Sequence, residues 1–451
     1  MTAGPTASSV PRPSGLVLSP FRALRYDPVT AGPLSALTSP PYDVIDADGV
    51  VALEQISEHN VVRLILPRED VGAGQGRYAR AAALLATWRE SGVLVPDEVP
   101  ALYVYEQAAP DLDGRPGHVQ RGLLGALGLT PAEDEIVLPH ENTMAGPVSD
   151  RLALYTAVEA DLEPIFLVYD GGGAASTAVA SVDADALGPD LLVDEVLADG
   201  LRHRLWAITD ETVHQAVAED LLTRKALIAD GHHRYATYLR RQADRHEAGA
   251  GVGPWDYGLC LLVDATAFGP QVHPIHRVVP GVPVATLAAQ AAAGAQVRRL
   301  DSTAAAALEL ALGELAAVTG PAFLLVDGAV SELHLVTDPD PEKLAAAVPA
   351  ERSAAWAALD VSVLHAYLVG ALWGLPDDVE HVSYEHDVAG ALAAAARSGG
   401  TAVLLKATPV ESVAAVAGSG ERMPRKSTLF TPKPSTGLVI RDHRDGDGDG
   451  D

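Results

Sequence analysis

The stretch Ala226–Leu239, ALIADGHHRYATYL, decides how the fold of this chain is interpreted. Its apolar start, ALIA, is typical of a buried strand, which we expect to end at Asp230. Gly231 permits a tight turn with positive φ, and the letters HHR at 232–234 then occupy the first turn of an expected helix. The stretch therefore predicts a strand, a turn and a helix, with several ionisable groups gathered at the turn.

The turn has the chemistry of a phosphate-binding loop. The first turn of a helix offers unpaired N–H groups and positive charge, so an anion is favoured beside Gly231. Arg234 can donate paired hydrogen bonds to a phosphate, and His232 and His233 can exchange protons near neutral pH. Asp230 can hold Mg²⁺ or orient a histidine. The spacing alone fits equally well an ordinary helix start with surface histidines.

Composition limits the classes of partner. The 451 residues are 48% hydrophobic and 20% charged, which indicates a folded protein of two or three domains. Lys and Arg number 32 against 60 Asp and Glu, so the formal net charge is -28. This charge repels nucleic acids and anionic lipids, and we expect neither as a partner. A small phosphate ligand stays compatible with it, because a pocket can be locally positive.

The cysteine count and the hydropathy pattern point to a cytoplasmic protein. Cys260 is the single cysteine and lies in YGLCLLVDA, a predicted buried strand, which excludes an intrachain disulfide and a Cys-rich zinc site. No apolar run reaches the roughly 20 residues of a membrane-spanning helix. The sequence does not indicate an oligomeric state.

Short apolar runs alternate with helical patterns, which predicts an α/β or α+β fold. The expected strands are NVVRLILP (60–67), ALYVYEQ (101–107), PIFLVYD (164–170) and HRLWAITD (203–210), and the expected helices are RYARAAALLATWRE (77–90), RLALYTAVEADL (151–162) and ETVHQAVAEDLLTR (211–224). We expect a disordered N-terminus at 1–15, an N-terminal α/β region at 16–130, a core with the phosphate loop at 131–280, a C-terminal α/β region at 281–440 and an acidic disordered tail at 441–451.

The segment SPPYDVI (39–45) is a diproline turn that presents Tyr42 and Asp43 as candidate substrate-binding residues. Asp43 can bind a substrate amine or a metal ion, and it fits equally well the anchor of a turn. Arg63, on the predicted strand NVVRLILP, is expected to form an ion pair rather than to contact a substrate.

Two later motifs offer further cations. HPIHR (273–277) is expected to be extended, so its histidines point to opposite faces and do not share a metal, which leaves His276 and Arg277 as candidate phosphate contacts. GERMPRKST (420–428) lacks the geometry of a nucleotide-binding P-loop. It either supplies Arg422, Arg425 or Lys426 to an anionic ligand or is an exposed basic loop.

The motifs together resemble known families. DGHHR after a strand resembles the phosphate-binding loop of the ParB and sulfiredoxin superfamily, which includes free serine kinases, and the preceding loop LPHENT (138–143), helix and strand follow the same order. The whole chain between its tails resembles a widespread bacterial family of unknown function, some of whose relatives are pyrophosphate-dependent serine kinases. The motifs that carry this resemblance are SPPYDVI, NVVRLILP, VLPHENTMAGPVSDRLALY, HRLWAITD, ALIADGHHRYAT, HPIHRVV and GERMPRKSTLFTPKPSTGLVI.

The resemblance implies a ParB/sulfiredoxin-like core with additional α/β regions, and a phosphotransferase that makes O-phosphoserine from free L-serine. Pyrophosphate or ATP/ADP would be the donor and Mg²⁺ the expected ion. Glu141 in LPHENT would be the general base, oriented by His140, with Asp230 as a further catalytic group. Two alternatives stay open: a ParB-like nucleotide-binding regulatory or DNA-associated protein, and a phosphatase or nucleotidase that uses water as the acceptor.

Overall fold

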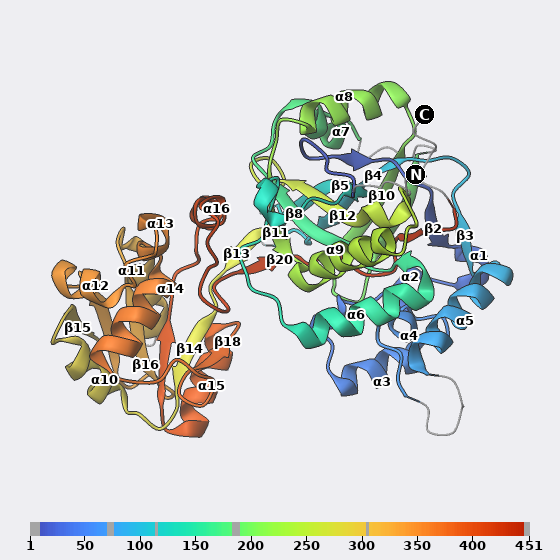
Figure 1. Ribbon diagram of the computed structural model, residues 1–451. Helices are drawn as coiled ribbons and strands as arrows, with labels where there is room; N and C mark the ends of the chain where they lie inside the picture. Colours follow the sequence, from blue (N-terminus) through green and yellow to red (C-terminus); the bar gives the residue numbers. More distant parts are fainter. Residues whose placement is uncertain (1–9, 70–75, 113–115, 183–189, 304–305, 446–451) are drawn as a thin grey trace. The chain divides into compact units, whose positions relative to one another are not determined.

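The computed structural model describes residues 10–69, 76–112, 116–182, 190–303 and 306–445, and it has a mixed α/β fold (Figure 1). The chain divides into two compact units. Unit 1 comprises residues 1–270 and 432–451, and unit 2 comprises residues 271–431. The C-terminal segment therefore returns to the unit in which the chain begins.

Unit 1 is built on a large mixed sheet. Its central strands are buried on both faces, which is why they read as continuous apolar runs such as IFLVY. The strand order is β6 (Val137–Leu138), β11 (Ala226–Asp230), β8 (Ile165–Tyr169), β12 (Tyr257–Asp264), β5 (Val119–Gly128), β4 (Leu102–Ala108), β10 (Arg202–Ile208) and β9 (Leu191–Val196), with β1 (Leu18–Ser19) also paired to β5. In this register Cys260 on β12 lies opposite Gly125 of β5 and Ile165 of β8. Cys260 is buried, and burial raises the pKa of its thiol, as expected for an inert packed side chain.

The longer helices of unit 1 pack against one another in two groups. α9 (His232–Glu247) contacts α6 (Ala145–Val158), α6 contacts α5 (Arg77–Glu90), and α7 (Gly173–Ser181) contacts α8 (Glu211–Leu221) (Figure 1). The shorter elements are α1 (Pro28–Ala31), α2 (Leu34–Leu37), α3 (Ala47–Ile56), α4 (Val62–Ile65) and the 3₁₀ turns η1 (Tyr42–Val44), η2 (Ala132–Asp134) and η3 (Pro254–Asp256). A second sheet, of β3 (Leu94–Pro96), β2 (Ala23–Tyr26), β21 (Ile440–Asp442) and β7 (Ala160–Asp161), joins the two ends of the chain.

Unit 2 is an antiparallel sheet with alanine-rich helices. The strand order is β15 (Gln296–Leu300), β17 (Leu333–Thr337), β16 (Phe323–Asp327), β19 (Thr401–Leu404), β14 (His276–Val279) and β18 (Ser383–Glu385), and β13 (Gln271–His273) pairs with β20 (Leu429–Thr431). The helices are α10 (Val284–Ala291), α11 (Ala307–Ala317), α12 (Pro341–Ala347), α13 (Ala354–Ala357), α14 (Asp360–Ser362), the π-helix η4 (Val363–Leu372), α15 (Val388–Ser398) and α16 (Val410–Gly418). Small residues such as Ala311 and Ala391 let these helices pack against Leu324 and Leu404 of the sheet.

One predicted strand is wrong. NVVRLILP contains the helix α4, because Asn60 supports a turn there: its side-chain oxygen accepts a hydrogen bond from Val62 N–H (3.0 Å) and its amide donates to the carbonyl of Ala36 (2.8 Å). The predicted ion pair of Arg63 is confirmed, since its Nη1 lies 3.8 Å from Oε1 of Glu54. The predicted helix 151–162 begins earlier, at 145, and ends at 158.

The units cut across the expected regions. Strands from both 16–130 and 131–280 share the large sheet, and residues 432–440 belong to unit 1. Residues 441–445, expected to be disordered, are held in place: Arg441 donates to Asp161 (2.8 Å) and Arg89 pairs with Asp445 (2.6 Å). Residues 1–9 and 446–451 of the expected tails lie outside the described residues. Within the described ranges, no helix has both the length and the apolar character needed to cross a bilayer.

Candidate active site

The predicted strand, turn and helix at the opening stretch are confirmed. β11 ends at Asp230, Gly231 has a φ of 95° in the left-handed region, and α9 begins at His232. A Cβ at position 231 would lie 3.1 Å from Nε of Arg234, so the turn needs glycine both for its φ and for this close approach. The N-cap residue of α9 is Gly231, which has no side chain to accept a hydrogen bond from the first turn. The start of a helix favours an anion, and the binding of a phosphate at this turn stays a prediction.

Arg234 lies inside the protein rather than on the surface of the turn. It is 1% exposed, its Nη1 donates to the carbonyl of Pro164 (2.5 Å), and its Nη2 donates to Oδ2 of Asp230 (2.5 Å). Burial by itself lowers the pKa of Arg234, but Asp230 and Glu163 outweigh it and the pKa is raised. A cation that is already committed to internal acceptors fixes Asp230 and the turn. We therefore revise the expected role of Arg234 from phosphate contact to anchor of the loop.

The two histidines of the turn hold the loop that follows β6. His140 N–H donates to Nε2 of His232 (3.2 Å), and Met144 N–H donates to Nε2 of His233 (3.0 Å). An imidazole nitrogen that accepts a hydrogen bond carries no proton, so each neutral ring carries its hydrogen on Nδ1. Burial lowers the pKa of His233, which favours the neutral form. The pair thus fastens residues 140–144 to the start of α9.

This attachment places Glu141 beside the turn. Its Oε2 lies 4.0 Å from Nδ1 of His232, the nitrogen that carries the hydrogen in the neutral ring. The side chain of Glu141 remains 36% exposed and can meet a substrate, whereas His140 is buried and its ring packs edge-on against that of His232, with centroids 4.6 Å apart. The structure therefore brings together the acidic loop residue and the turn, which lie about ninety positions apart in the sequence.

A third segment reaches the same place through Lys433, which sequence reasoning missed. Its Nζ lies 2.5 Å from Oδ1 of Asp230 and 3.6 Å from Oδ2 of Asp43. Burial lowers the pKa of Lys433, but these two carboxylates outweigh it and the pKa is raised. Burial by itself raises the pKa of Asp43, but Lys433 and Arg234 outweigh this effect and the pKa is lowered. An ammonium group thus bridges the SPPYDVI turn and the DGHHR turn.

Polar side chains from the large sheet hold the segment that carries Lys433. Gln107 on β4 donates to the carbonyl of Lys433 (2.9 Å), and Gln120 on β5 donates to that of Pro432 (3.0 Å). Tyr105 accepts a hydrogen bond from Ser435 N–H (3.3 Å). These buried polar residues interrupt apolar strands because they replace water for the backbone of residues 432–435. Their signal in the sequence is a set of glutamines at otherwise apolar strand positions.

Tyr42 anchors the SPPYDVI turn. Its N–H donates to Oε1 of the fully buried Glu163 (2.9 Å), and its ring lies under the guanidinium of Arg151, 4.3 Å from ring centroid to Cζ. Burial raises the pKa of Tyr42 to about 12, and burial also raises that of Glu163 against the effect of Arg234 and Arg151. Contacts with the buried Glu163 and Arg151 therefore hold the turn in place, and Asp43 faces Lys433.

The geometry does not make Asp230 a direct metal ligand. Both of its carboxylate oxygens are taken by cations, Oδ1 by Lys433 and Oδ2 by Arg234. Among the residues that the structure describes, no group of three or more His, Cys, Asp or Glu side chains could hold a metal ion. Mg²⁺ stays a prediction for the donor phosphates, with which it is usually bound through few protein ligands.

The remaining candidate residues belong to unit 2. His276 is buried and its Nδ1 accepts from Leu405 N–H (3.2 Å), and burial lowers its pKa to about 4. Arg277 is also buried, with Nε donating to Nε2 of His365 (3.1 Å), and burial lowers its pKa to about 10. Arg422 is half-buried and Lys426 is exposed. The role of these four residues in phosphate binding stays a prediction.

Several solved structures are similar to this chain at low identity. A free serine kinase in complex with AMP is 14% identical with a TM-score of 0.33, over 75% of this chain and 94% of its own. A conserved hypothetical protein from Pyrococcus furiosus is 14% identical with a TM-score of 0.32, over 75% and 100%. SbnI with a C-terminal truncation, from Staphylococcus aureus, is 12% identical with a TM-score of 0.34, over 70% and 87%. TM-scores below 0.5 do not establish a shared fold, and the ParB/sulfiredoxin-like assignment of the core stays a prediction.

No curated protein matches the chain in sequence. Residues 18–362, well over half of the chain, match the model of a family described as protein of unknown function, DUF1015. The predicted membership of a family of unknown function is confirmed: the chain belongs to the DUF1015 family.

Proposed function

We propose that this protein is a phosphotransferase that moves a phosphoryl group from pyrophosphate or a nucleotide to the hydroxyl of L-serine. One observation carries the proposal: Glu141, a solvent-accessible carboxylate, lies 4.0 Å from His232 in the first turn of α9. A base beside an anion-binding helix start is what hydroxyl phosphorylation requires. The choice of serine and of these donors rests on the resemblance of the sequence motifs.

The donor would bind with its terminal phosphate at the first-turn N–H groups of α9. Lys433 would supply positive charge next to it, because its Nζ already lies among the side chains that surround the turn. Arg234, through Asp230, holds both the turn and Lys433 in position. Fixed charges and dipoles of this kind stabilise a transferring phosphoryl group without covalent participation of the protein.

Glu141 would take the proton of the serine hydroxyl as its oxygen attacks the phosphorus atom. The bond between that phosphorus and the bridging oxygen breaks, and phosphate or the nucleotide product leaves with the bonding electrons. Nδ1 of His232 lies 4.0 Å from Oε2 of Glu141, so the imidazole would help to orient the carboxylate. Positioning of acceptor and donor supplies most of the rate.

Asp43 would bind the α-ammonium group of serine. In the structure it already accompanies an ammonium, that of Lys433 at 3.6 Å, and it keeps its negative charge because its pKa is lowered. The side chain of Asp43 is 37% exposed, so a second ammonium can approach it from solvent. Asp43 would then have both of the roles considered for it from the sequence, because the same carboxylate anchors the turn and binds the substrate amine.

The test is a donor panel. The purified chain is incubated with L-serine, Mg²⁺ and each of pyrophosphate, ADP and ATP, and O-phosphoserine is followed by ³¹P NMR. We expect O-phosphoserine from at least one donor, and its absence with all three contradicts the proposal. Phosphate released at the same rate without serine identifies a phosphatase or nucleotidase instead. A DNA-associated role is disfavoured by the net charge of -28.

A further inference from the structure

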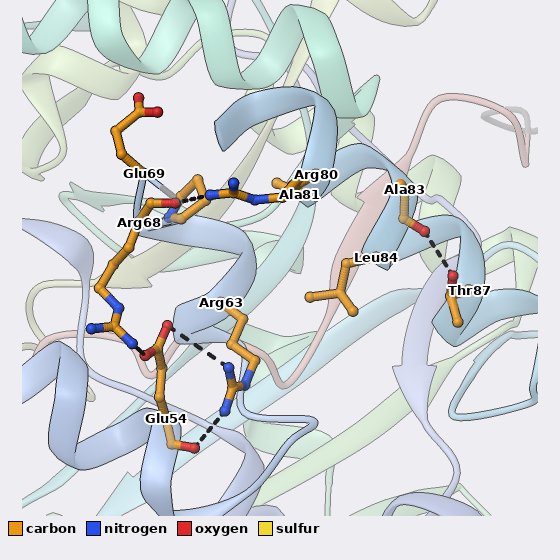
Figure 2. A pocket seen from close by; sticks show the side chains of 10 residues that line it. Glu54, Arg63, Arg68, Glu69, Arg80, Ala81, Ala83, Leu84 and Thr87 are labelled. Atoms are coloured by element: carbon orange, nitrogen blue, oxygen red, sulfur yellow. Dashed lines mark hydrogen bonds and ion pairs between the residues drawn. The ribbon is translucent and has the colours of Figure 1, made fainter. Parts of the chain in front are cut away.

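Unit 1 has a pocket that shares no residue with the candidate active site. It lies between α3, the end of α4 and α5, and its volume is about 620 Å³, a size that suits a small metabolite (Figure 2). One wall is apolar, from Ala81 and Leu84 of α5. The other walls carry charged side chains, and Figure 2 shows Arg63 and Arg68 turned towards Glu54.

Three arginines line this pocket, and two of them share one largely buried carboxylate. Glu54 on α3 meets Arg63 of α4, with Nη1 3.8 Å from Oε1, and also pairs with Arg68 through Oε2 (Figure 2). Glu69 lines the pocket as well, but its side chain is 69% exposed and its charge is screened by solvent. Three guanidinium groups against one enclosed carboxylate leave the pocket locally positive within a chain of net charge -28.

Arg80 is the pocket arginine for which the described part of the chain supplies no carboxylate partner. Its Nη2 donates to the main-chain carbonyl of Arg68, whereas its Nη1 is buried and has no hydrogen-bond partner among the described residues (Figure 2). A buried cationic donor without an acceptor is costly, so it gains more than a solvated one from a ligand oxygen. An arginine fork is also suited to the planar carboxylate and to phosphate.

We propose that this pocket binds a small organic oxyanion, with a carboxylate or phosphate group on Arg80 and Arg63 and an apolar part against Leu84. The ligand would complete the hydrogen bonding of Arg80 Nη1 and would compete with Glu54 for its arginines. The proposal concerns binding alone and does not depend on the proposed transferase activity.

The first test measures affinity on the full chain by isothermal titration calorimetry, with citrate and inorganic phosphate as separate probes and sodium chloride of equal ionic strength as the blank. We expect saturable binding of at least one probe, and the stronger of the two identifies the preferred group. Arg80→Met should weaken it roughly 10- to 100-fold, the loss of one charge-assisted hydrogen bond. Arg298→Met, at an exposed arginine paired with Glu314 in unit 2, is the matched control and should leave the affinity unchanged.

The second test has the opposite sign, so that structural damage cannot imitate it. Glu54→Gln removes the carboxylate that competes for Arg63 and Arg68, and we expect the same probe to bind several-fold more tightly. Equal affinity of wild type and Arg80→Met would overturn the proposal, and so would weaker binding by Glu54→Gln or the absence of saturable binding of either probe. Because neither a donor nor serine is present, failure here leaves the phosphotransferase proposal intact.

Discussion

Replacing Lys433 by methionine tests the charge cluster that joins the three segments of the site. The side chain of Lys433 is 18% exposed, and its Nζ lies 2.5 Å from Asp230 and 3.6 Å from Asp43. Lys433→Met keeps the length and most of the apolar volume of the side chain. It leaves two carboxylates facing each other without the cation between them.

The magnitude follows from the burial of the partners. Removing one member of a buried ion pair costs about 3–5 kcal/mol, because the other charge is left uncompensated. Asp230 still pairs with Arg234, and the side chain of Asp43 is 37% exposed, so water recovers part of the loss. We therefore expect the free energy of unfolding of unit 1 to fall by about 2–4 kcal/mol at pH 7.

Urea unfolding followed by tryptophan fluorescence measures this loss. Lys225→Met is the matched control, since Lys225 pairs with Glu135 on the surface, with side chains 54% and 57% exposed, and its loss should cost below about 1 kcal/mol. The pKa of Asp43 is lowered in the folded protein, so its stabilising effect is present above its ordinary pKa of about 3.9 and is lost as pH falls through the lower folded value. The difference between wild type and Lys433→Met should shrink below about pH 4, and a loss at pH 7 no larger than that of the control would refute the reasoning.

Gly231→Ala should lower the free energy of unfolding by at least about 1–2 kcal/mol, because alanine is strained at positive φ and its Cβ would crowd Arg234. Gly92→Ala is the control for backbone strain alone, since Gly92 has a φ of 72° and nothing lies within 4 Å of its Cβ position. If both variants lose the same free energy of unfolding, the contact with Arg234 has no effect. Arg234→Met should cost about 3–5 kcal/mol in urea unfolding, because it removes the fully buried cation that pairs with Asp230 and leaves that carboxylate with Lys433 alone. A cost below about 1 kcal/mol would contradict the role of Arg234 as a buried anchor. The pKa of His233, measured by NMR, should lie below the ordinary value of about 6.5. Its neutral form therefore contributes stability that is fully present above that value and is lost as pH falls through the folded pKa, whereas a measured value above 6.5 would contradict the burial of the ring.

The local parts of the site could be predicted from the sequence because they depend on neighbouring residues. The apolar run ending at Asp230 and the glycine at 231 determine the strand, the turn and the helix start. The helix RYARAAALLATWRE has the predicted ends, 77 and 90. NVVRLILP failed because a run of apolar residues is equally compatible with a buried strand and a buried helix turn, and the side chain of Asn60 favours the turn.

The long-range parts could not be predicted, since they depend on contacts between distant segments. Lys433 meets Asp230 about two hundred positions away, and nothing in TPKPSTG indicates which carboxylate its ammonium will find. The burial of Arg234 could not be predicted either, because its acceptor is the carbonyl of Pro164, which immediately precedes a different strand, β8. The sequence favours Arg422 and Lys426 over Lys433 as ligands of an anion, because they lie in a denser cluster of basic residues.

The most direct test of the account compares wild type with Glu141→Gln in two measurements, O-phosphoserine formation and donor affinity. Glu135→Gln is the control, because Glu135 pairs with Lys225 on the surface. We expect Glu141→Gln to lose roughly 100-fold or more in turnover, the usual contribution of a general base, while donor affinity and the control stay unchanged. A Glu141→Gln protein that forms O-phosphoserine at the wild-type rate would contradict the central claim that this carboxylate acts at the start of α9.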